Sequence, residues 1–215
     1  MRTGFSPTGL IAILRGLTPG EAVAIGHAVS DAGIGILEVP LNSPDPCQSI
    51  SLLRKALPGC LVGAGTVLTT AQVEEAHAAG AQLVVSPNTD VSVITETVRR
   101  GLGSYPGAAT PSEAFAALSA GARAVKVFPA VQVGPAAMKA WTDVLPAWAE
   151  LIPVGGIDAA SFPEWVAAGA TGFGIGSALY RPGMRPADVA GRARALQSAW
   201  EQASTSLNRG TGARS

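Results

Sequence analysis

The pattern that most constrains the fold of this chain is a glycine that recurs at the end of helical segments, directly before a short apolar run. It occurs at five positions: Gly33, Gly80, Gly101, Gly121 and Gly169. Successive glycines are 47, 21, 20 and 48 residues apart, which indicates a period of about 20 to 24 residues with two steps doubled. Glycine suits the left-handed position that follows a helix. The chain is therefore expected to repeat one helix-to-strand unit.

Filling the doubled steps at Pro58-Gly59 and Pro146, and adding the opening run, gives eight apolar runs: 10–15, 36–41, 61–67, 83–87, 104–108, 124–129, 151–156 and 171–177. Runs rich in Val, Ile and Leu, separated by helices long enough for crossovers, are typical of parallel strands with both faces covered. We therefore predict an α/β fold, a single-domain (β/α)8 TIM barrel. A doubly wound open sheet is the competing architecture, but eight near-equal units without a dinucleotide-binding motif argue against it.

Helix starts support this interpretation. In three of them a hydroxyl residue precedes Glu by three positions, as in a capping box: Thr18 with Glu21, Thr110 with Glu113, and Ser161 with Glu164.

The 215 residues are expected to form one barrel over residues 10–201, with an N-terminal extension (1–9) and a flexible C-terminal tail (202–215). Fifteen basic and fifteen acidic residues give zero net charge, so nothing predicts binding to nucleic acid or to an anionic membrane.

Cysteine content and the lack of long apolar stretches indicate the cellular compartment of the protein. The two cysteines, Cys47 and Cys60, lack zinc-site spacing and are too few for a disulfide framework. The first residues, MRTGFSPTG, lack the apolar core of a signal peptide. The longest uncharged stretch, 56–73, is too polar for a membrane span. We expect a soluble protein of the cytoplasm.

Lys126 is a charged residue inside an apolar strand, the run 124–129. It could form a structural ion pair, since buried lysines are usually paired. Burial also lowers the pKa of a lysine, and the neutral amine that results can attack a carbonyl carbon to form a Schiff base. We favour this aldolase-type chemistry.

Three more polar residues lie in strand runs. Glu38 is the only acidic residue in one; it could be an ion-pair partner of Lys126, but we favour a proton carrier for Schiff base chemistry. Arg15 and Thr66 lie near the carboxyl ends of their strands, where barrel reaction sites lie. They could hold a carboxylate or hydroxyl groups, or be a rim ion pair and an ordinary strand residue.

Glycine-rich turns follow the last two predicted strands, at Gly155-Gly156 and around Gly176-Ser177. Loops at these positions commonly bind phosphate in barrels, through exposed backbone N–H groups. Tight turning alone would also need glycine, but two adjacent turns of this kind favour a phosphate site. No cluster with metal-ligand spacing is present, so no metal site is predicted.

Eight motifs occur in order between Leu10 and Trp200: LIAILRG, EVPLNSP, VGAGTVL, VSPN, PGAATPSEAF, VKVFPA, PVGGI and GIGSALY. Together they closely resemble the 2-keto-3-deoxy-6-phosphogluconate and phosphogalactonate aldolases, which are small Schiff base barrels. The resemblance implies a class I aldolase that needs no metal or organic cofactor and is typically a homotrimer.

The resemblance implies that Lys126 forms the Schiff base with the 2-keto carbon and that Glu38 relays protons. Cleavage between carbons 3 and 4 of a phosphorylated keto acid would release pyruvate and glyceraldehyde 3-phosphate. Phe128 would wall the pyruvate pocket. The other implied substrate contacts are Arg15, Thr66, Val154, Gly155, Gly156, Gly176 and Ser177, the last four around the phosphate.

Two departures from the gluconate type favour the galactonate branch. The second strand reads EVPLNS instead of an EVTLRT-like sequence, and Val154 replaces Thr before Gly155-Gly156. We therefore expect 2-dehydro-3-deoxy-6-phosphogalactonate as the substrate. Asn42 stands where the gluconate type has Arg, so the resemblance leaves open which residue holds the substrate carboxylate, with Arg15 as the available substitute.

Other functions stay open. The 2-dehydro-3-deoxy-6-phosphogluconate and 4-hydroxy-2-oxoglutarate aldolase activities need the same amine and acid. A phosphosugar epimerase barrel would use the glycine turns but leave Lys126 unexplained, and a non-catalytic phosphate-binding barrel would need neither Lys126 nor Glu38.

Overall fold

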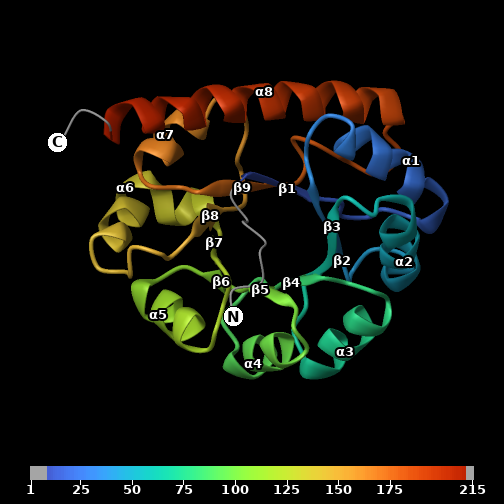
Figure 1. Cartoon of the computed structure of the whole chain (residues 1–215), viewed down its shortest axis with the longest axis horizontal. Helices are drawn as coiled ribbons and strands as arrows, with labels where there is room; N and C mark the ends of the chain where they lie inside the picture. Colours follow the sequence, from blue (N-terminus) through green and yellow to red (C-terminus); the bar gives the residue numbers. More distant parts are fainter. Residues whose placement is uncertain (1–8, 212–215) are drawn as a thin grey trace.

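The computed structural model describes the backbone of residues 9–211 and the side chains of residues 9–205, and within this range strands alternate with helices. The strands are β1 (Gly9–Ile13), β2 (Ile36–Pro40), β3 (Leu61–Gly65), β4 (Leu83–Val85), β5 (Gly103–Tyr105), β6 (Gly107–Ala108), β7 (Val125–Val127), β8 (Leu151–Pro153) and β9 (Gly172–Ile175). The helices are α1 (Pro19–Ser30), α2 (Pro46–Ala56), α3 (Thr70–Ala78), α4 (Val91–Arg99), α5 (Pro111–Ser119), α6 (Ala130–Thr142), α7 (Phe162–Ala167) and α8 (Pro186–Thr211). The strands surround a common centre and the helices lie outside them (Figure 1).

The recurring glycines end helices as predicted. All five have positive φ: Gly33 at 95°, Gly80 at 87°, Gly101 at 74°, Gly121 at 97° and Gly169 at 101°. Each therefore adopts the left-handed conformation in which residues with a side chain are strained. The helix-to-strand repeat that the sequence predicts is confirmed.

Two of the three predicted caps form. Thr110 and Glu113 form a reciprocal capping box, in which the Thr110 N–H donates to Glu113 Oε2 over 2.8 Å and the Glu113 N–H donates to Thr110 Oγ1 over 3.3 Å. Thr18 is the N-cap of α1 and also forms a capping box. The prediction at Ser161 is wrong, because its hydroxyl donates to the Asp158 carbonyl over 2.8 Å and caps nothing in α7.

The strands pair in parallel throughout, which confirms the predicted α/β class, but they form two sheets within the described range. One has the order β5-β4-β3-β2-β1-β9 and the other β6-β7-β8. The predicted fifth run is split into β5 and β6 at Pro106, because proline has no N–H for the strand ladder. The Pro106 carbonyl still accepts the Lys126 N–H over 2.9 Å, and an isolated parallel bridge joins Val154, after β8, to Gly174 of β9.

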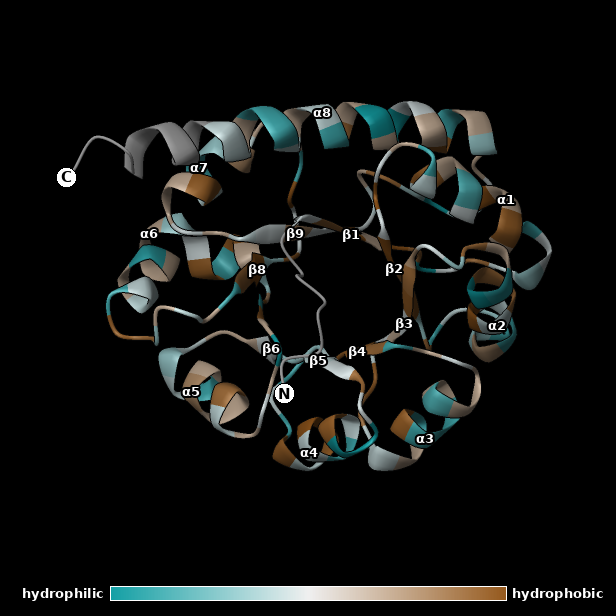
Figure 2. Ribbon diagram, in the orientation of Figure 1, coloured by the Kyte–Doolittle hydropathy of each residue, from teal (hydrophilic) through white to brown (hydrophobic). Residues whose placement is uncertain are grey.

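The core has two apolar clusters, because successive strand side chains point to opposite faces. The larger includes fully buried Phe162 and Leu37, and burying each such side chain contributes about 1.5–3 kcal/mol. The smaller consists of Ile11, Ile13, Ile36, Leu83, Val85, Tyr105, Ala124, Ile152 and Val154. Apolar residues dominate the strands, and many hydrophilic residues lie on the outer helices (Figure 2).

The last helix closes the ring of helices. α8 packs against both α1 and α7 (Figure 1), and the Tyr180 hydroxyl donates to Glu21 Oε1 over 3.0 Å. α8 continues beyond Gln202, where the sequence predicts a tail, to Thr211. Residues 1–8 of the predicted extension and 212–215 of the predicted tail lie outside the described residues. No helix in residues 9–211 combines the length and apolar character needed to cross a membrane.

Candidate active site

Lys126 is the middle residue of β7 and lines a cavity between the strands. Only 8% of the residue is exposed, and its Nζ lies 4.4 Å from the centre of the Phe128 ring. Burial lowers the pKa of Lys126 and the positive charge of Arg15 lowers it further, while Glu38 opposes both. The site therefore favours a larger fraction of neutral amine, the form that can act as a nucleophile.

Glu38, in β2, is 2% exposed. Burial raises its pKa to about 7, although the charges of Lys126 and Arg15 act in the opposite direction. Its Oε2 is buried and has no hydrogen-bond partner within the described part of the chain. A carboxyl group is suited to general acid–base chemistry when its pKa is near neutrality and one of its oxygens is available to exchange a proton with a ligand.

The two groups line one cavity from different strands. Their strands belong to different sheets, yet Lys126 and Glu38 line the same cavity, of about 10 Å³. This inner cavity is completed by Ile11, Ile13, Val85, Tyr105, Ile152, Val154 and Gly174. Its volume is close to that of a single water site. An amine and a carboxyl group therefore share a small, mainly apolar space.

Gly65, the last residue of β3, makes room for the Glu38 carboxylate. A Cβ built at Gly65 would overlap Oε2 and the carboxyl carbon of Glu38. Any side chain at position 65 would displace the acid. Gly65 is a site residue that the sequence analysis did not identify.

Arg15 lies just after β1 and is held by the ends of the two neighbouring strands. Its Nη1 donates to Asn42 Oδ1 over 2.6 Å, and its Nη2 donates to Thr66 Oγ1 over 3.4 Å. Thr66 has a φ of 56°, which is rare for a β-branched residue. Strain of this kind tends to occur at functional sites.

A second, larger pocket of about 180 Å³ adjoins the inner cavity. It is lined by Ile13, Arg15, Phe128, Val154, Gly155, Gly156, Ile157, Gly174, Gly176 and Ser177. The two spaces share Ile13, Val154 and Gly174. A ligand with one end at Lys126 could therefore extend past Val154 into this outer pocket.

Two glycine turns contribute backbone N–H groups to the lining of the outer pocket. Gly155 and Gly156 have φ values of 100° and 75°, and a one-turn segment begins at Gly176, whose carbonyl accepts the N–H groups of Leu179 and Tyr180. Among the described residues, no acceptor pairs with the backbone N–H groups of Gly155, Gly156, Gly176 or Ser177. Unpaired N–H groups in such turns can bind an anion.

The structure brings the sequence-predicted residues together. Lys126 and Glu38 line the inner cavity, and Val154 lines both spaces. Phe128, the glycine turns and Arg15 line the outer pocket, and Thr66 joins the group through Arg15. Two features of the site were not predicted from the sequence: the role of Gly65, for which its position beside the strand that carries Glu38 was the available signal, and the contact of Asn42 with Arg15.

A family model described as "Aldolase: KDPG and KHG aldolase" matches residues 6–192 of the chain. The chain is 48% identical, over 89% of its length and 91% of the relative's, to the "Probable 2-dehydro-3-deoxy-6-phosphogalactonate aldolase" of Rhizobium meliloti (strain 1021). It is 45% identical to the "2-dehydro-3-deoxy-6-phosphogalactonate aldolase" of Escherichia coli (strain K12), over 90% of its length and 95% of the relative's.

A solved structure described as "Native KDPGal structure" superposes with a TM-score of 0.91 at 44% sequence identity. The match covers 94% of this chain and 98% of the other. The structural similarity therefore includes the strands whose residues line the inner cavity and the outer pocket.

Proposed function

Because the chain belongs to the KDPG and KHG aldolase family, we propose that it is a class I aldolase that cleaves 2-dehydro-3-deoxy-6-phosphogalactonate to pyruvate and glyceraldehyde 3-phosphate. The observation that carries the chemistry is the pair of Lys126 and Glu38 in one small inner cavity. A buried amine and a buried acid with opposite pKa shifts are what Schiff base formation and proton relay require.

The reaction begins when the neutral Lys126 amine attacks the 2-keto carbon and forms a carbinolamine. Loss of water gives an iminium ion. Glu38 then takes the proton of the C4 hydroxyl, the bond between C3 and C4 breaks, and its electron pair moves into the iminium to give an enamine. Glyceraldehyde 3-phosphate leaves as the aldehyde. Protonation of the enamine at C3 and hydrolysis of the iminium release pyruvate and regenerate Lys126.

The outer pocket fits the rest of the substrate. Arg15 supplies a cation to this pocket and contacts the Thr66 hydroxyl, and the Phe128 ring, which lies next to Lys126, would wall the pyruvate moiety. The N–H groups of Gly155, Gly156, Gly176 and Ser177 receive the phosphate. Val154, at the junction of the two spaces, would lie near C4, the carbon whose configuration distinguishes the galactonate from the gluconate substrate.

The preference for the galactonate epimer is supported by the 48% and 45% identities to relatives that carry this name. Steady-state assays with the galactonate epimer, the gluconate epimer and 4-hydroxy-2-oxoglutarate test it. We expect the highest kcat/KM with the galactonate epimer. A higher value with either of the other substrates would contradict the assignment.

Trapping tests the Schiff base. Incubation with pyruvate and borohydride, followed by digestion and mass spectrometry, should place one reduced pyruvyl adduct on Lys126. Lys126→Ala should lose the adduct, and Lys55→Ala, at an exposed lysine of α2, should keep it. No adduct on folded wild-type protein would reject the aldolase mechanism and favour the phosphosugar epimerase or the non-catalytic phosphate-binding barrel.

We also propose that the two parallel sheets form one closed eight-stranded barrel in a single domain over residues 10–201. With β5 and β6 counted as one strand interrupted by Pro106, there are eight strands in the described range. The Val154–Gly174 bridge supports closure between β8 and β9. Closure would gather the carboxyl ends of all eight strands around one reaction site.

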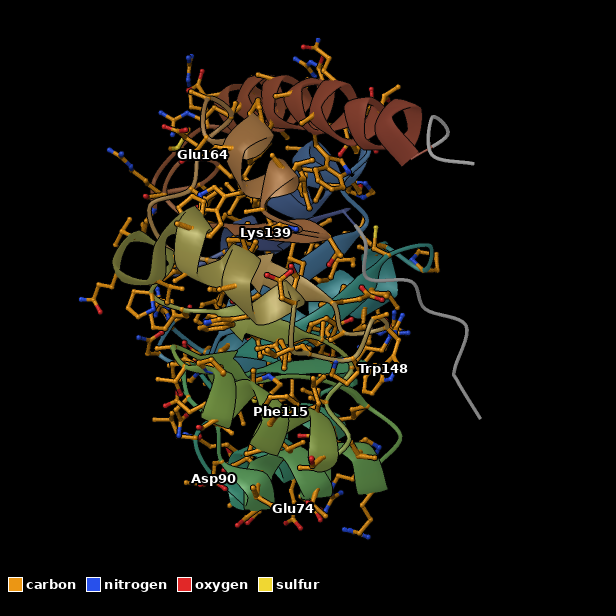
Figure 3. The ribbon with its side chains drawn as sticks, turned by 90° about the vertical axis from the view of Figure 1, so that its left-hand side faces the viewer. Glu74, Asp90, Phe115, Lys139, Trp148 and Glu164 are labelled. Atoms are coloured by element: carbon orange, nitrogen blue, oxygen red, sulfur yellow. The ribbon has the colours of Figure 1, made fainter. Side chains whose placement is uncertain are left out.

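A homotrimer in a reducing cytoplasm is the proposed working state. Exposed apolar residues, which often mark protein interfaces, include Phe115 (43% exposed) and Trp148 (51%), which Figure 3 shows on the same side of the molecule. The free cysteines Cys47 and Cys60 suit a reducing compartment. Light scattering should give three times the chain mass, and a monomeric mass at micromolar concentration would contradict the trimer.

A further inference from the structure

The side chain of Arg15 is exposed but held at both terminal nitrogens. Asn42 accepts from Nη1 over 2.6 Å and Thr66 accepts from Nη2 over 3.4 Å. The three residues follow β1, β2 and β3, which are neighbours in one sheet. The shorter contact has the length of a strong charge-assisted hydrogen bond, so Asn42 is the main partner of the guanidinium.

The backbone around Arg15 is held by the same strand and loop. The Leu14 N–H donates to the Glu38 carbonyl over 2.9 Å, and the Gly16 N–H donates to Ser43 Oγ over 2.9 Å. Ser43 is 8% exposed, so this hydrogen bond is largely shielded from water. The loop that carries Asn42 and Ser43 therefore fixes Arg15 at its backbone and at its guanidinium.

Arg15 lies in the pocket that adjoins the cavity of the reacting pair. Arg15 lines the outer pocket, and its charge lowers the pKa of both Glu38 and Lys126. Apart from Lys126, it is the one positively charged side chain among the described residues that line the two spaces. In a 2-keto acid the carboxylate is bonded directly to the carbon that Lys126 attacks, so this carboxylate comes within reach of Arg15.

We propose that Asn42 is a positioning residue that holds Arg15 as the receptor for the carboxylate of the 2-keto acid, with Thr66 as a second, weaker support. The proposal rests on the proposed function. An exposed arginine without such a partner samples many rotamers and must be ordered when the ligand binds, which lowers affinity. Asn42 removes this loss before binding and touches no reacting atom.

The test measures the pyruvate concentration that half-saturates borohydride-trapped adduct on Lys126. Asn42→Ala should raise this concentration about tenfold, as expected for loss of a hydrogen bond to a charged group, and should leave the trapped amount at saturating pyruvate unchanged. KM for the cleavage substrate should rise with little change in kcat. Methyl pyruvate, which lacks the carboxylate charge, should show no difference between Asn42→Ala and wild type.

A double-mutant cycle separates positioning from a general structural role. Arg15→Ala should weaken pyruvate binding more than Asn42→Ala does, and the double variant should match Arg15→Ala within about twofold, because Asn42 then has no group to hold. Gln48→Ala, at an exposed residue of α2 close to the same loop, should behave as wild type.

Three results would overturn the proposal. An unchanged half-saturation in Asn42→Ala would remove the role of Asn42 while leaving the aldolase assignment intact. A full tenfold effect of Asn42→Ala in the Arg15→Ala background would show that Asn42 acts elsewhere. Absence of any adduct in wild-type protein would reject the proposed function and, with it, the carboxylate receptor.

Discussion

The inner cavity and the outer pocket share three wall residues but differ in how they act on a ligand. The inner cavity is lined by three ionisable side chains, Lys126, Glu38 and Tyr105, and burial changes the pKa of each. The outer pocket presents backbone N–H groups from two glycine turns, and these groups have no acceptor in the part of the chain that the structure describes. The inner cavity acts through side chains that are shielded from water. The outer pocket acts through backbone N–H groups that are accessible because glycine has no side chain. Substitutions should therefore affect chemistry in one region and affinity in the other.

The largest effect is expected in the inner cavity. Glu38→Gln preserves the shape of the side chain but removes the proton carrier, so kcat should fall on the order of 10³-fold. Glu164→Gln, at an exposed acid of α7 that is labelled in Figure 3, is the matched control. Aldol cleavage at pH 8 is the measurement, and a loss below tenfold in Glu38→Gln would show that another group carries the proton.

Gly65→Ala tests whether the inner cavity depends on the position of the acid. The added methyl group would overlap the Glu38 carboxylate, and an acid displaced by about 1 Å can cost on the order of 10²-fold in kcat. Gly59→Ala is the matched control because a Cβ there meets nothing within 4 Å. If both variants have wild-type kcat and normal thermal stability, Glu38 does not need the space above Gly65.

The pH dependence of activity should report the inner cavity. Burial raises the pKa of Glu38 to about 7, and the acid must be ionised to accept the C4 hydroxyl proton. Below pH 7, kcat/KM should therefore fall about tenfold per pH unit. Wild type and Glu38→Gln are compared between pH 5 and 9. A wild-type profile that stays flat down to pH 5 is incompatible with this role.

The smallest effect is expected in the outer pocket. A Cβ at Gly176 meets no atom within 4 Å, so Gly176→Ala should fold normally and place its methyl group near the proposed phosphate site. KM for the phosphorylated substrate should rise about fivefold, roughly the value of one hydrogen bond, while half-saturation by pyruvate stays at the wild-type value. Equal weakening of both ligands would mean that the two regions do not act separately.

The two regions also differ in how far the sequence predicts them. Lys126 and Glu38 stand out as charges inside apolar strands, and the glycine turns stand out by composition, so the sequence alone predicts all of them as site residues. The overlap of Gly65 with Glu38 and the bond from Arg15 to Asn42 were not predicted, because each joins side chains from different strands. No local pattern indicates the left-handed Thr66.

The fold shows the same division. Helix ends were predicted well because glycine conformation is a local property, and all five recurring glycines have positive φ. The prediction of a cap at Ser161 failed because Asp158 competes for its hydroxyl. The split at Pro106 was not predicted. The run 104–108 contains this proline, which has no N–H group, but the spacing of apolar runs does not reveal a break inside one run.

The first strand also bears on how the protein reaches its native state. β1 pairs on one side with β2 and on the other with β9, in the register Gly9 to Gly172. During synthesis, the edge of β1 that pairs with β9 stays without its partner until Gly172–Ile175 have been made. Contacts over such sequence distances slow folding, and an unpaired strand edge invites aggregation. A ribosome stalled before residue 172 should therefore hold a chain that still needs protection by chaperones.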